Sequence, residues 1–193
     1  MLLKPESEFI LKKLNDDLAP QLYYHSVRHT LDVYERAGYI ADHENITGKD
    51  KELLLVAVLY HDSGYLVQKE GHEKISCDIA LKALPDFGYS REDIETICRI
   101  IMATKLPQQP HTLAEEIICD ADLDYLGRDD FFELGSDLYK EMLASDSVTG
   151  KEDWDLQQID FLSQHKYFTK TAQQLRNQKK EENLTILLSK SVS

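Results

Sequence analysis

The sequence predicts an all-α fold, and three observations support that prediction. The chain has 193 residues but only 8 glycines and 5 prolines, about half the usual share of these turn-forming residues. β-Sandwiches, barrels and propellers need turn residues every few positions, so the composition argues against all three. Hydrophobic residues make up 42% of the chain, and they recur every three or four positions, as on a buried helix face. The longest apolar run, residues 53–60, is far shorter than the ~20 residues of a membrane span.

Apolar stripes and stop signals predict the first three helices. Pro5 suits the start of a helix over residues 5–18, and Pro20 ends that helix. Residues 26–43 carry a second apolar stripe at helical spacing. Residues 50–62 are apolar on nearly every side, so this third helix should lie in the middle of the bundle.

Glycine and capping residues delimit the helices that follow. Gly71 ends a loop, and a fourth helix runs from there to Leu84. Ser90 and Asp93 resemble a capping box for a fifth helix, which reaches residue 104. Further helices are expected over residues 113–123, 131–143, 154–165 and 169–188. We therefore expect a bundle of about eight or nine helices.

The domain organisation is predicted to be simple. No shift in composition, flexible linker or internal repeat marks a second domain. We expect one domain over residues 1–193, with a core at about 22–130 and C-terminal helices over 131–190 that pack on it.

The charge balance restricts the partners. The chain has 22 basic and 35 acidic residues, a net charge of −13, and such a field repels nucleic-acid polymers. A small phosphorylated substrate remains compatible, because a bound divalent cation supplies positive charge locally. The N-terminus has no signal-peptide pattern, so we expect a cytoplasmic protein without a membrane partner.

The cysteines lie in apolar stretches without a C-x-x-C pair, which predicts buried, reduced thiols; they are Cys77, Cys98 and Cys119.

Histidine and aspartate gather at three places in the chain. His25 and His29 are four residues apart, a spacing that puts both on one helix face. The pair His61-Asp62 ends the most apolar predicted helix, where an unpaired buried carboxylate would cost several kcal/mol. A divalent metal ion bound by both side chains removes that cost. Further ligands are needed, and the candidates are His29 and one aspartate of the run Asp120, Asp122 and Asp124.

In this order, His29, His61-Asp62 and an aspartate of CDADLDYLG resemble the H…HD…D signature of the HD superfamily of metal-dependent phosphohydrolases. The likeness extends over about residues 22–130 and is weak beyond them. It implies an all-α bundle that binds a divalent metal through His29, His61, Asp62 and Asp122. Asp122 is chosen because the last ligand of the family typically follows an alanine, and Asp120 and Asp124 remain alternatives. The resemblance does not distinguish Mn, Mg, Fe, Zn, Co and Ni.

Two further histidines are weighed through the same resemblance. His25 precedes His29 as in the YHxxxH motif of related cyclic-nucleotide phosphodiesterases, where the first histidine protonates the leaving oxygen; alternatively, it caps the helix or hydrogen bonds a ligand. His72 could contact the substrate or bind a second metal ion bridged by Asp62. Thr104 stands where another ligand would be expected, so a complete second metal site is in doubt.

Basic residues beside the motifs are candidate phosphate contacts, namely Arg28, Lys105 and Arg128, and His165 with Lys166 could fold back over the site.

The resemblance implies a hydrolase that cleaves a phosphate mono- or diester of a nucleotide-like small molecule with metal-activated water. Asp62 would orient that water and His25 would act as the acid. The alternatives are a non-catalytic regulatory module that binds a nucleotide or a partner and, less favoured, a di-iron oxygenase. Substrate identity and oligomeric state, including a homo-oligomer, stay open.

Overall fold

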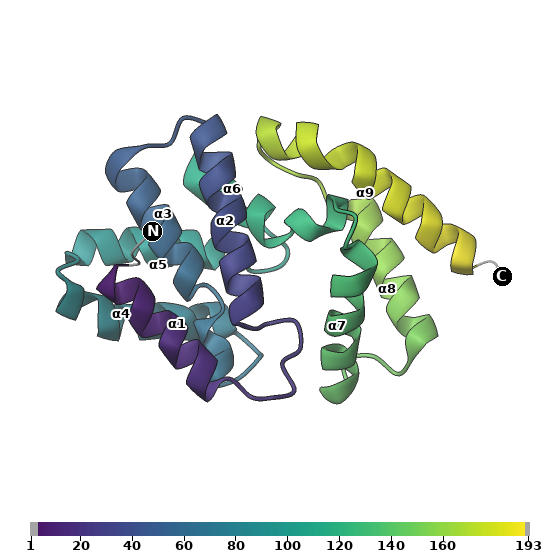
Figure 1. The fold of residues 1–193 in the computed structure, drawn as a ribbon, viewed down its shortest axis with the longest axis horizontal. Coiled ribbons are helices and arrows are strands. Elements are labelled where there is room, and N and C mark those ends of the chain that lie inside the picture. Colours follow the sequence, from purple (N-terminus) through teal and green to yellow (C-terminus); the bar gives the residue numbers. More distant parts are fainter. Residues whose placement is uncertain (1–3, 192–193) are drawn as a thin grey trace.

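The computed structural model describes residues 4–191, and its regular elements are all helices. Figure 1 shows two groups of them, with α1–α6 on the left and α7–α9 on the right. The α-helices are α1 Pro5–Asp17, α2 Val27–His43, α3 Gly48–Tyr60, α4 His72–Ala83, α5 Arg91–Ala103, α6 Leu113–Asp122, α7 Phe131–Ala144, α8 Lys151–Gln164 and α9 Lys170–Ser191. Three short 3₁₀ helices join them, η1 Ser63–Leu66, η2 Leu84–Phe87 and η3 Asp124–Gly127. The predicted all-α bundle is confirmed.

Local capping explains where several helices begin. Ser90 Oγ accepts the Asp93 N–H at 3.2 Å and the Asp93 carboxylate accepts the Ser90 N–H at 3.1 Å, so the predicted capping box of α5 is present. α8 begins at Lys151, earlier than the predicted residue 154. The cause is Asp153, whose carboxylate accepts the Thr149 N–H at 2.8 Å and extends the start of the helix.

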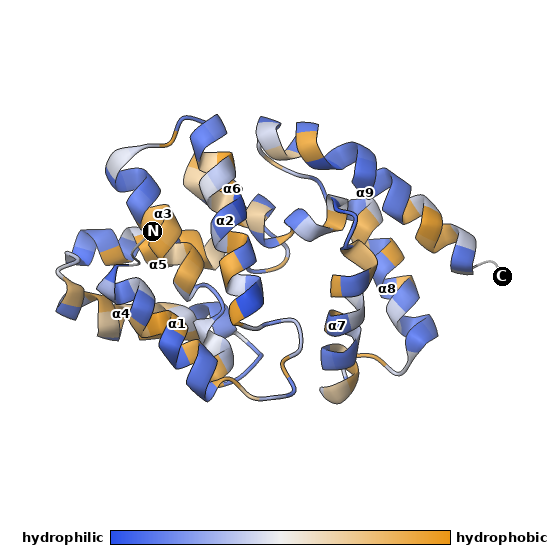
Figure 2. Ribbon diagram, viewed as in Figure 1, coloured by the Kyte–Doolittle hydropathy of each residue, from blue (hydrophilic) through white to orange (hydrophobic). Residues whose placement is uncertain are grey.

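The main hydrophobic core lies among α1–α6. α3 is central, as its composition predicts: Leu54, Ala57 and Val58 are fully buried. Figure 2 shows the inner turns of α3 in orange, surrounded by helices whose outer faces are blue. Burial on this scale supplies the main favourable free energy of folding. The apolar core therefore fixes the positions of the helix ends that follow it.

A second, smaller apolar cluster joins α7–α9 to η3. Phe131, Leu162 and Leu187 are buried in it together with Tyr125 and Leu126. Among residues 4–191, no helix is both long and apolar enough to cross a bilayer. The assignment of residues 1–193 to one domain stays a prediction, and residues 1–3 and 192–193 lie outside the described range.

Polar contacts connect the two groups of helices, and we call them the polar joint. Each involves a carboxylate that accepts or pairs with groups far away in sequence. The contacts are Glu44 to Thr171, Asp120 to Phe168 and Thr169, Asp124 to Arg176, and Glu141 to Tyr24 and His25. Directional hydrogen bonds thus set how α7–α9 lie against α1–α6.

Candidate metal centre

Three helix ends bring four predicted ligands together. His29 lies in the first turn of α2, His61 and Asp62 directly follow α3, and Asp122 is the last residue of α6. α2 packs on both α3 and α6, so these ends converge. His61, Asp62 and Asp122 lie at the ends of the largely apolar α3 and α6, and His29 lies on the buried face of amphipathic α2.

The four side chains face one another across a small space. His29 Nε2 lies 3.1 Å from Asp122 Oδ1 and 3.3 Å from Asp62 Oδ2. His61 Nε2 lies 3.2 Å from Asp62 Oδ2 and 3.4 Å from Asp122 Oδ1. Ligand atoms of His29, His61 and Asp122 all lie within 4.8 Å of one another. Two imidazoles and two carboxylates therefore direct nitrogen and oxygen atoms at one point.

The hydrogen bonding of this group indicates a metal site. His61 Nδ1–H donates to the Val58 carbonyl oxygen at 2.7 Å, which leaves the lone pair of Nε2 facing the centre. His61 Nε2 and Asp62 Oδ2 are buried, and neither forms a hydrogen bond of normal geometry within residues 4–191. Unsatisfied buried polar atoms are costly unless a ligand satisfies them. The donor set of histidine nitrogen and carboxylate oxygen fits a divalent transition metal.

Charge is concentrated at this centre. Burial alone would lower the pKa of His29, but Asp122 and Asp62 raise it to about 9. Burial opposes ionisation of Asp122 as well, yet the hydrogen bond from His29 and the nearby charge of His61 hold its pKa below its usual value. The pKa of His61 is raised and that of Asp62 is lowered in the same way, by their mutual charge against burial. Without an ion, protonated His29 and His61 offset the charge of the two ionised carboxylates, and a dication would replace the two protons.

The other two aspartates of the CDADLDYLG run serve the polar joint. Asp120 accepts the Phe168 and Thr169 N–H groups, both at 2.8 Å. Asp124 forms a bidentate pair with Arg176 at 2.7 and 3.0 Å. The alternation of the run gives the physical reason, because residues two apart point to different sides of a helix. Asp122 alone of the three faces His29 and His61.

His72 lies on the other side of Asp62. Its Nε2 is 3.3 Å from Asp62 Oδ1 and 3.9 Å from Glu73 Oε1, and its Nδ1–H donates to the Lys69 carbonyl oxygen at 3.1 Å. A close backbone approach makes this possible, because a Cβ on Gly64 would lie 2.0 Å from the His72 carbonyl oxygen. The two oxygens of Asp62 therefore face two different groups of ligand atoms.

His25 is held by a residue that the sequence analysis missed. Its Nδ1 hydrogen bonds to Oε1 of Glu141, a buried carboxylate on α7, and its Nε2 lies 3.2 Å from the Tyr65 hydroxyl. The His25 ring stacks on Tyr65 with centroids 4.2 Å apart and lies 5.9 Å from the ring of His29. A signal for Glu141 was present, because it follows Leu134 and Leu138 on the apolar stripe of α7.

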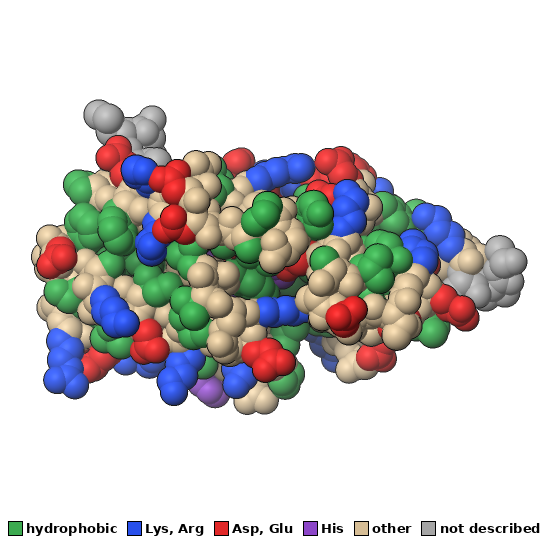
Figure 3. Space-filling model, turned by 90° about the horizontal axis from the view of Figure 1, so that it is seen from below, with side chains coloured by type: hydrophobic (Ala, Val, Ile, Leu, Met, Phe, Trp, Pro, Cys, Tyr) green, Lys and Arg blue, Asp and Glu red, His purple; other side chains and the backbone are tan. Residues whose placement is uncertain are grey.

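A cavity of about 550 Å³ opens onto Asp62 and Asp122. Its far wall comes from α7 and α8, where the lining includes Leu138, Met142, Trp154, Gln157, Gln158 and Phe161. Figure 3 shows this side of the molecule hollowed between its two halves, with basic side chains beside the hollow. Lys69, also missed from the sequence, lines the cavity and donates to Ser145 and Ser147 at 3.1 and 2.7 Å.

The predicted phosphate contacts occupy different places. Lys105 lines the large cavity, as does Thr104. Arg28 is exposed and lies with Arg128 at a smaller opening on the His29 side. Arg128 is paired with Asp32, Asp124 and Asp130. The remaining basic candidates behave differently: His165 packs against Phe161 and Tyr167 outside the cavity lining, and Lys166 is exposed.

Comparisons with known proteins agree on the fold. A predicted HD superfamily hydrolase from an uncultured Thermotogales bacterium is 20% identical, with a TM-score of 0.61 over 95% of this chain and 86% of that one. Bacillus subtilis YpgQ, solved in complex with ADP, is 17% identical, with a TM-score of 0.65 over 95% and 94%. A Lactobacillus plantarum protein is 17% identical, with a TM-score of 0.68 over 98% of both chains.

The sequence comparison identifies the family. No protein of curated function matches the chain significantly. Residues 26–124, just over half of the chain, match the HD domain. This match begins just before His29 and ends just after Asp122, so it contains the four side chains that face one another. The chain belongs to the HD domain family.

Proposed function

We propose that this protein is a metal-dependent phosphohydrolase that cleaves a phosphate ester of a nucleotide-like small molecule. The observation that carries the proposal is the pair of buried, unsatisfied atoms, His61 Nε2 and Asp62 Oδ2, directed at His29 and Asp122 beside a large cavity. These four residues would hold a divalent ion, which would supply a lowered pKa for a bound water molecule and polarisation of a phosphoryl oxygen. Membership of the HD domain family supports this reading.

The remaining steps belong to side chains of this chain. Asp62 orients the attacking water and accepts its proton through a carboxylate that already faces both ligand groups. His25 would protonate the leaving oxygen from Nε2, which lies beside Tyr65 at the cavity. Because Glu141 holds the Nδ1 proton, this step uses the doubly protonated imidazolium form of His25. His72 contacts either the substrate or a second ion shared through Asp62 Oδ1, at 3.3 Å from that oxygen.

The cavity supports a substrate with a bulky organic group. Its volume of about 550 Å³ is far larger than a phosphate needs and lies in the range of sites for small organic molecules. Trp154 and Phe161 offer aromatic surface, and the side-chain amides of Gln157 and Gln158 offer hydrogen bonds that suit a nucleobase. Lys69 and Lys105 supply positive charge for phosphate at the same cavity. The ADP in the YpgQ structure is compatible with this substrate class.

A hydrolysis screen tests the proposal. Release of phosphate and pyrophosphate is measured over nucleoside mono-, di- and triphosphates and cyclic nucleotides, with each of Mn²⁺, Mg²⁺, Fe²⁺, Co²⁺, Ni²⁺ and Zn²⁺. We expect at least one substrate to be hydrolysed, EDTA to stop the reaction and one metal to restore it. Tight nucleotide binding without product from any substrate would contradict the proposal and favour a regulatory module. Two irons per chain by elemental analysis, with no phosphate release, would favour an oxygenase.

A further inference from the structure

Glu141 is a buried carboxylate whose partners all belong to one dipeptide of the other helix group. Its side chain is 3% exposed. One carboxylate oxygen, Oε2, accepts the backbone N–H groups of Tyr24 and His25, both at 3.1 Å, and the other, Oε1, hydrogen bonds to His25 Nδ1. Burial would raise the pKa of Glu141, but the hydrogen bond and charge of His25 lower it overall. Glu141 is therefore ionised, and both of its carboxylate oxygens have hydrogen-bond partners.

These contacts determine which nitrogen of His25 faces the cavity. A carboxylate only accepts hydrogen bonds, so Nδ1 must carry a proton. Nε2 then points to the Tyr65 hydroxyl, 3.2 Å away, and Tyr24 and Tyr65 both pack against the imidazole ring. A histidine whose Nδ1–H is bound by a carboxylate is fixed in both tautomer and orientation.

We propose that Glu141 is a positioning residue for His25, so that a helix outside the HD match completes the reaction centre. The catalytic part of this inference rests on the proposed function, whereas the tautomer does not. The Glu141→Gln variant distinguishes two roles of Glu141: orienting the His25 ring, and merely connecting α7 to the backbone of residues 24 and 25. Its amide oxygen can still accept the two backbone N–H groups, but its NH₂ group then faces His25 Nδ1 and donates to it. The favoured proton position of His25 would move to Nε2 while the backbone contact remained.

Nitrogen NMR of the Zn²⁺-loaded protein tests the tautomer directly, at a pH where the ring is neutral. His25→Ala identifies the His25 signals among the seven histidines. We expect a protonated Nδ1 in the parent protein and a protonated Nε2 in Glu141→Gln, with no change in Glu152→Gln, whose side chain is exposed on α8. A protonated Nε2 in the parent protein, or the same tautomer in Glu141→Gln, would overturn the inference.

Kinetics on phenyl phosphate and p-nitrophenyl phosphate test the catalytic part. For His25→Ala, kcat on phenyl phosphate should fall by about 10²- to 10⁴-fold, and Glu141→Gln should lose about 10-fold or more. Both deficits should shrink on the nitrophenyl ester, whose leaving oxygen needs no proton, and the double variant should be no slower than His25→Ala. Equal losses on both esters, or losses that add, would overturn the positioning role. A parent protein inactive on every phosphate ester, with the expected tautomers, would instead contradict the proposed function.

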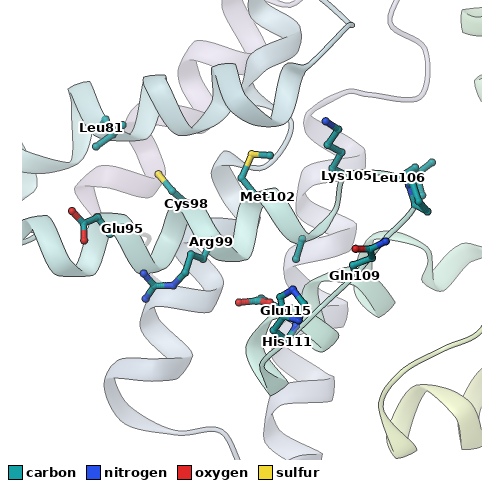
Figure 4. Close-up of a pocket in the computed structure, with 12 residues that line it drawn as sticks. Leu81, Glu95, Cys98, Arg99, Met102, Lys105, Leu106, Gln109, His111 and Glu115 are labelled. Carbon is teal, nitrogen blue, oxygen red and sulfur yellow. Dashed lines mark hydrogen bonds between the residues drawn. The ribbon is translucent and has the colours of Figure 1, made fainter.

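An independent observation concerns Cys77 on α4 and Cys98 on α5. Each thiol donates to the carbonyl oxygen of the other residue, Cys77 Sγ at 3.5 Å and Cys98 Sγ at 3.8 Å. Cys98 is half-buried and lines a surface cavity of about 770 Å³. Figure 4 shows its sulfur directed from α5 towards the helix that carries Leu81. Cys119, in contrast, is fully buried and donates to the Ala103 carbonyl oxygen at 3.1 Å.

The geometry points to Cys77 and Cys98 as a dithiol that hydrogen peroxide converts to a disulfide between α4 and α5. The Cys98 thiolate attacks the O–O bond, which gives a sulfenic acid and hydroxide, and the hydroxide takes the proton of Cys77 to form water. The Cys77 sulfur then attacks the sulfenic sulfur, the S–O bond breaks and the departing hydroxide is protonated to a second water. The two thiols lose two electrons and the peroxide gains them. The neighbouring Cys77 lowers the pKa of Cys98, and Cys98 is the more exposed of the two, which favours it as the first nucleophile.

Hydrogen peroxide treatment of the full chain tests this second inference. We expect two of the three thiols to disappear, a peptide map without reductant to link Cys77 to Cys98, and dithiothreitol to restore both. Cys119→Ser should form the same link, whereas Cys98→Ser should not. Three remaining thiols, a sulfinic acid at Cys98 without the link, or a bond to Cys119 or to a second chain would each overturn the assignment.

Discussion

The two groups of helices are held in different ways. In α1–α6 an extensive apolar core sets the helix ends from which His29, His61, Asp62 and Asp122 project. α7–α9 rest on a smaller apolar cluster and on the carboxylates of the polar joint. Apolar packing tolerates small shifts, whereas a buried carboxylate that loses its partners carries a large penalty. The comparison teaches that the positions of the four candidate ligands depend on the apolar core, whereas the position of the cavity wall depends on the polar joint.

The largest effect is expected when a candidate metal ligand of the first region, α1–α6, is removed. Asp62→Ala should abolish metal retention and activity, because it removes an oxygen between His29 and His61. It should also remove the metal-dependent rise in Tm, which corresponds to about 2.7 kcal/mol at an ion concentration of 100 Kd. Elemental analysis and thermal unfolding with and without EDTA provide the measurements. Asp86→Ala, on an exposed turn, is the control. Stoichiometric metal in Asp62→Ala would exclude this ligand set.

The second largest effect is expected from a substitution that disrupts the polar joint and leaves the candidate ligands intact. Arg176→Ala removes the bidentate partner of Asp124, whose side chain is only 3% exposed, and should cost about 3 kcal/mol of unfolding free energy. Metal content should stay unchanged in the folded protein. Urea unfolding and elemental analysis give both values. Lys179→Ala, which removes the partner of exposed Asp129 from the same helix as Arg176, should change neither quantity measurably. Metal loss in Arg176→Ala would show that the two regions are not separable.

Measurements over a range of pH test the charge arrangement of the candidate metal centre in the first region. Without metal, the pKa of His29 is about 9, above the usual ~6.5, so its ion pairs stabilise the protein below pH ~6.5 and are lost as pH rises towards 9. A divalent ion must displace that proton, and this alone should raise its apparent affinity by about 100-fold from pH 6 to 8. The proton of His61, whose pKa is also raised, adds to the increase. Calorimetry with Mn²⁺ and metal-free unfolding should show opposite trends. Exposed His43 serves as the control, because His43→Ala should keep both trends. An affinity independent of pH would contradict this charge arrangement.

The smallest effect concerns a residue at the boundary between the regions. Lys69 lines the cavity, and no carboxylate pairs with its ammonium group in the described part of the chain. Lys69→Ala should therefore raise KM for a phosphorylated substrate by about tenfold, or 1.4 kcal/mol, with little change in kcat. Steady-state kinetics decide this, with exposed Lys74→Ala as the control. An unchanged KM would remove Lys69 from the phosphate contacts.

The sequence predicted one region better than the other for a physical reason. His61 and Asp62 stand out because polar groups end an apolar helix, and their motif is local. Asp122 could be separated from Asp120 and Asp124 only by resemblance. In the structure Asp122 faces His29, whereas Asp120 and Asp124 contact Phe168 and Arg176. The contact of Glu141 spans 116 residues, and no local pattern specifies which distant backbone a buried carboxylate will reach. The helices of the wall were predicted, but their polar contacts could not be.

Gly64 shows how a residue that binds nothing can be as restricted as a ligand. Any Cβ at this position would lie 2.0 Å from the His72 carbonyl oxygen, well inside the contact distance of two atoms. α4 would have to move away from the turn that carries His61 and Asp62, to which Ser76 is also hydrogen bonded. In a library of random variants, every substitution at position 64 should therefore be depleted about as strongly as substitutions of the ligands themselves. Judged only by which substitutions are tolerated, Gly64 would look like a residue of the reaction centre. Its role is only to leave room for the backbone of α4.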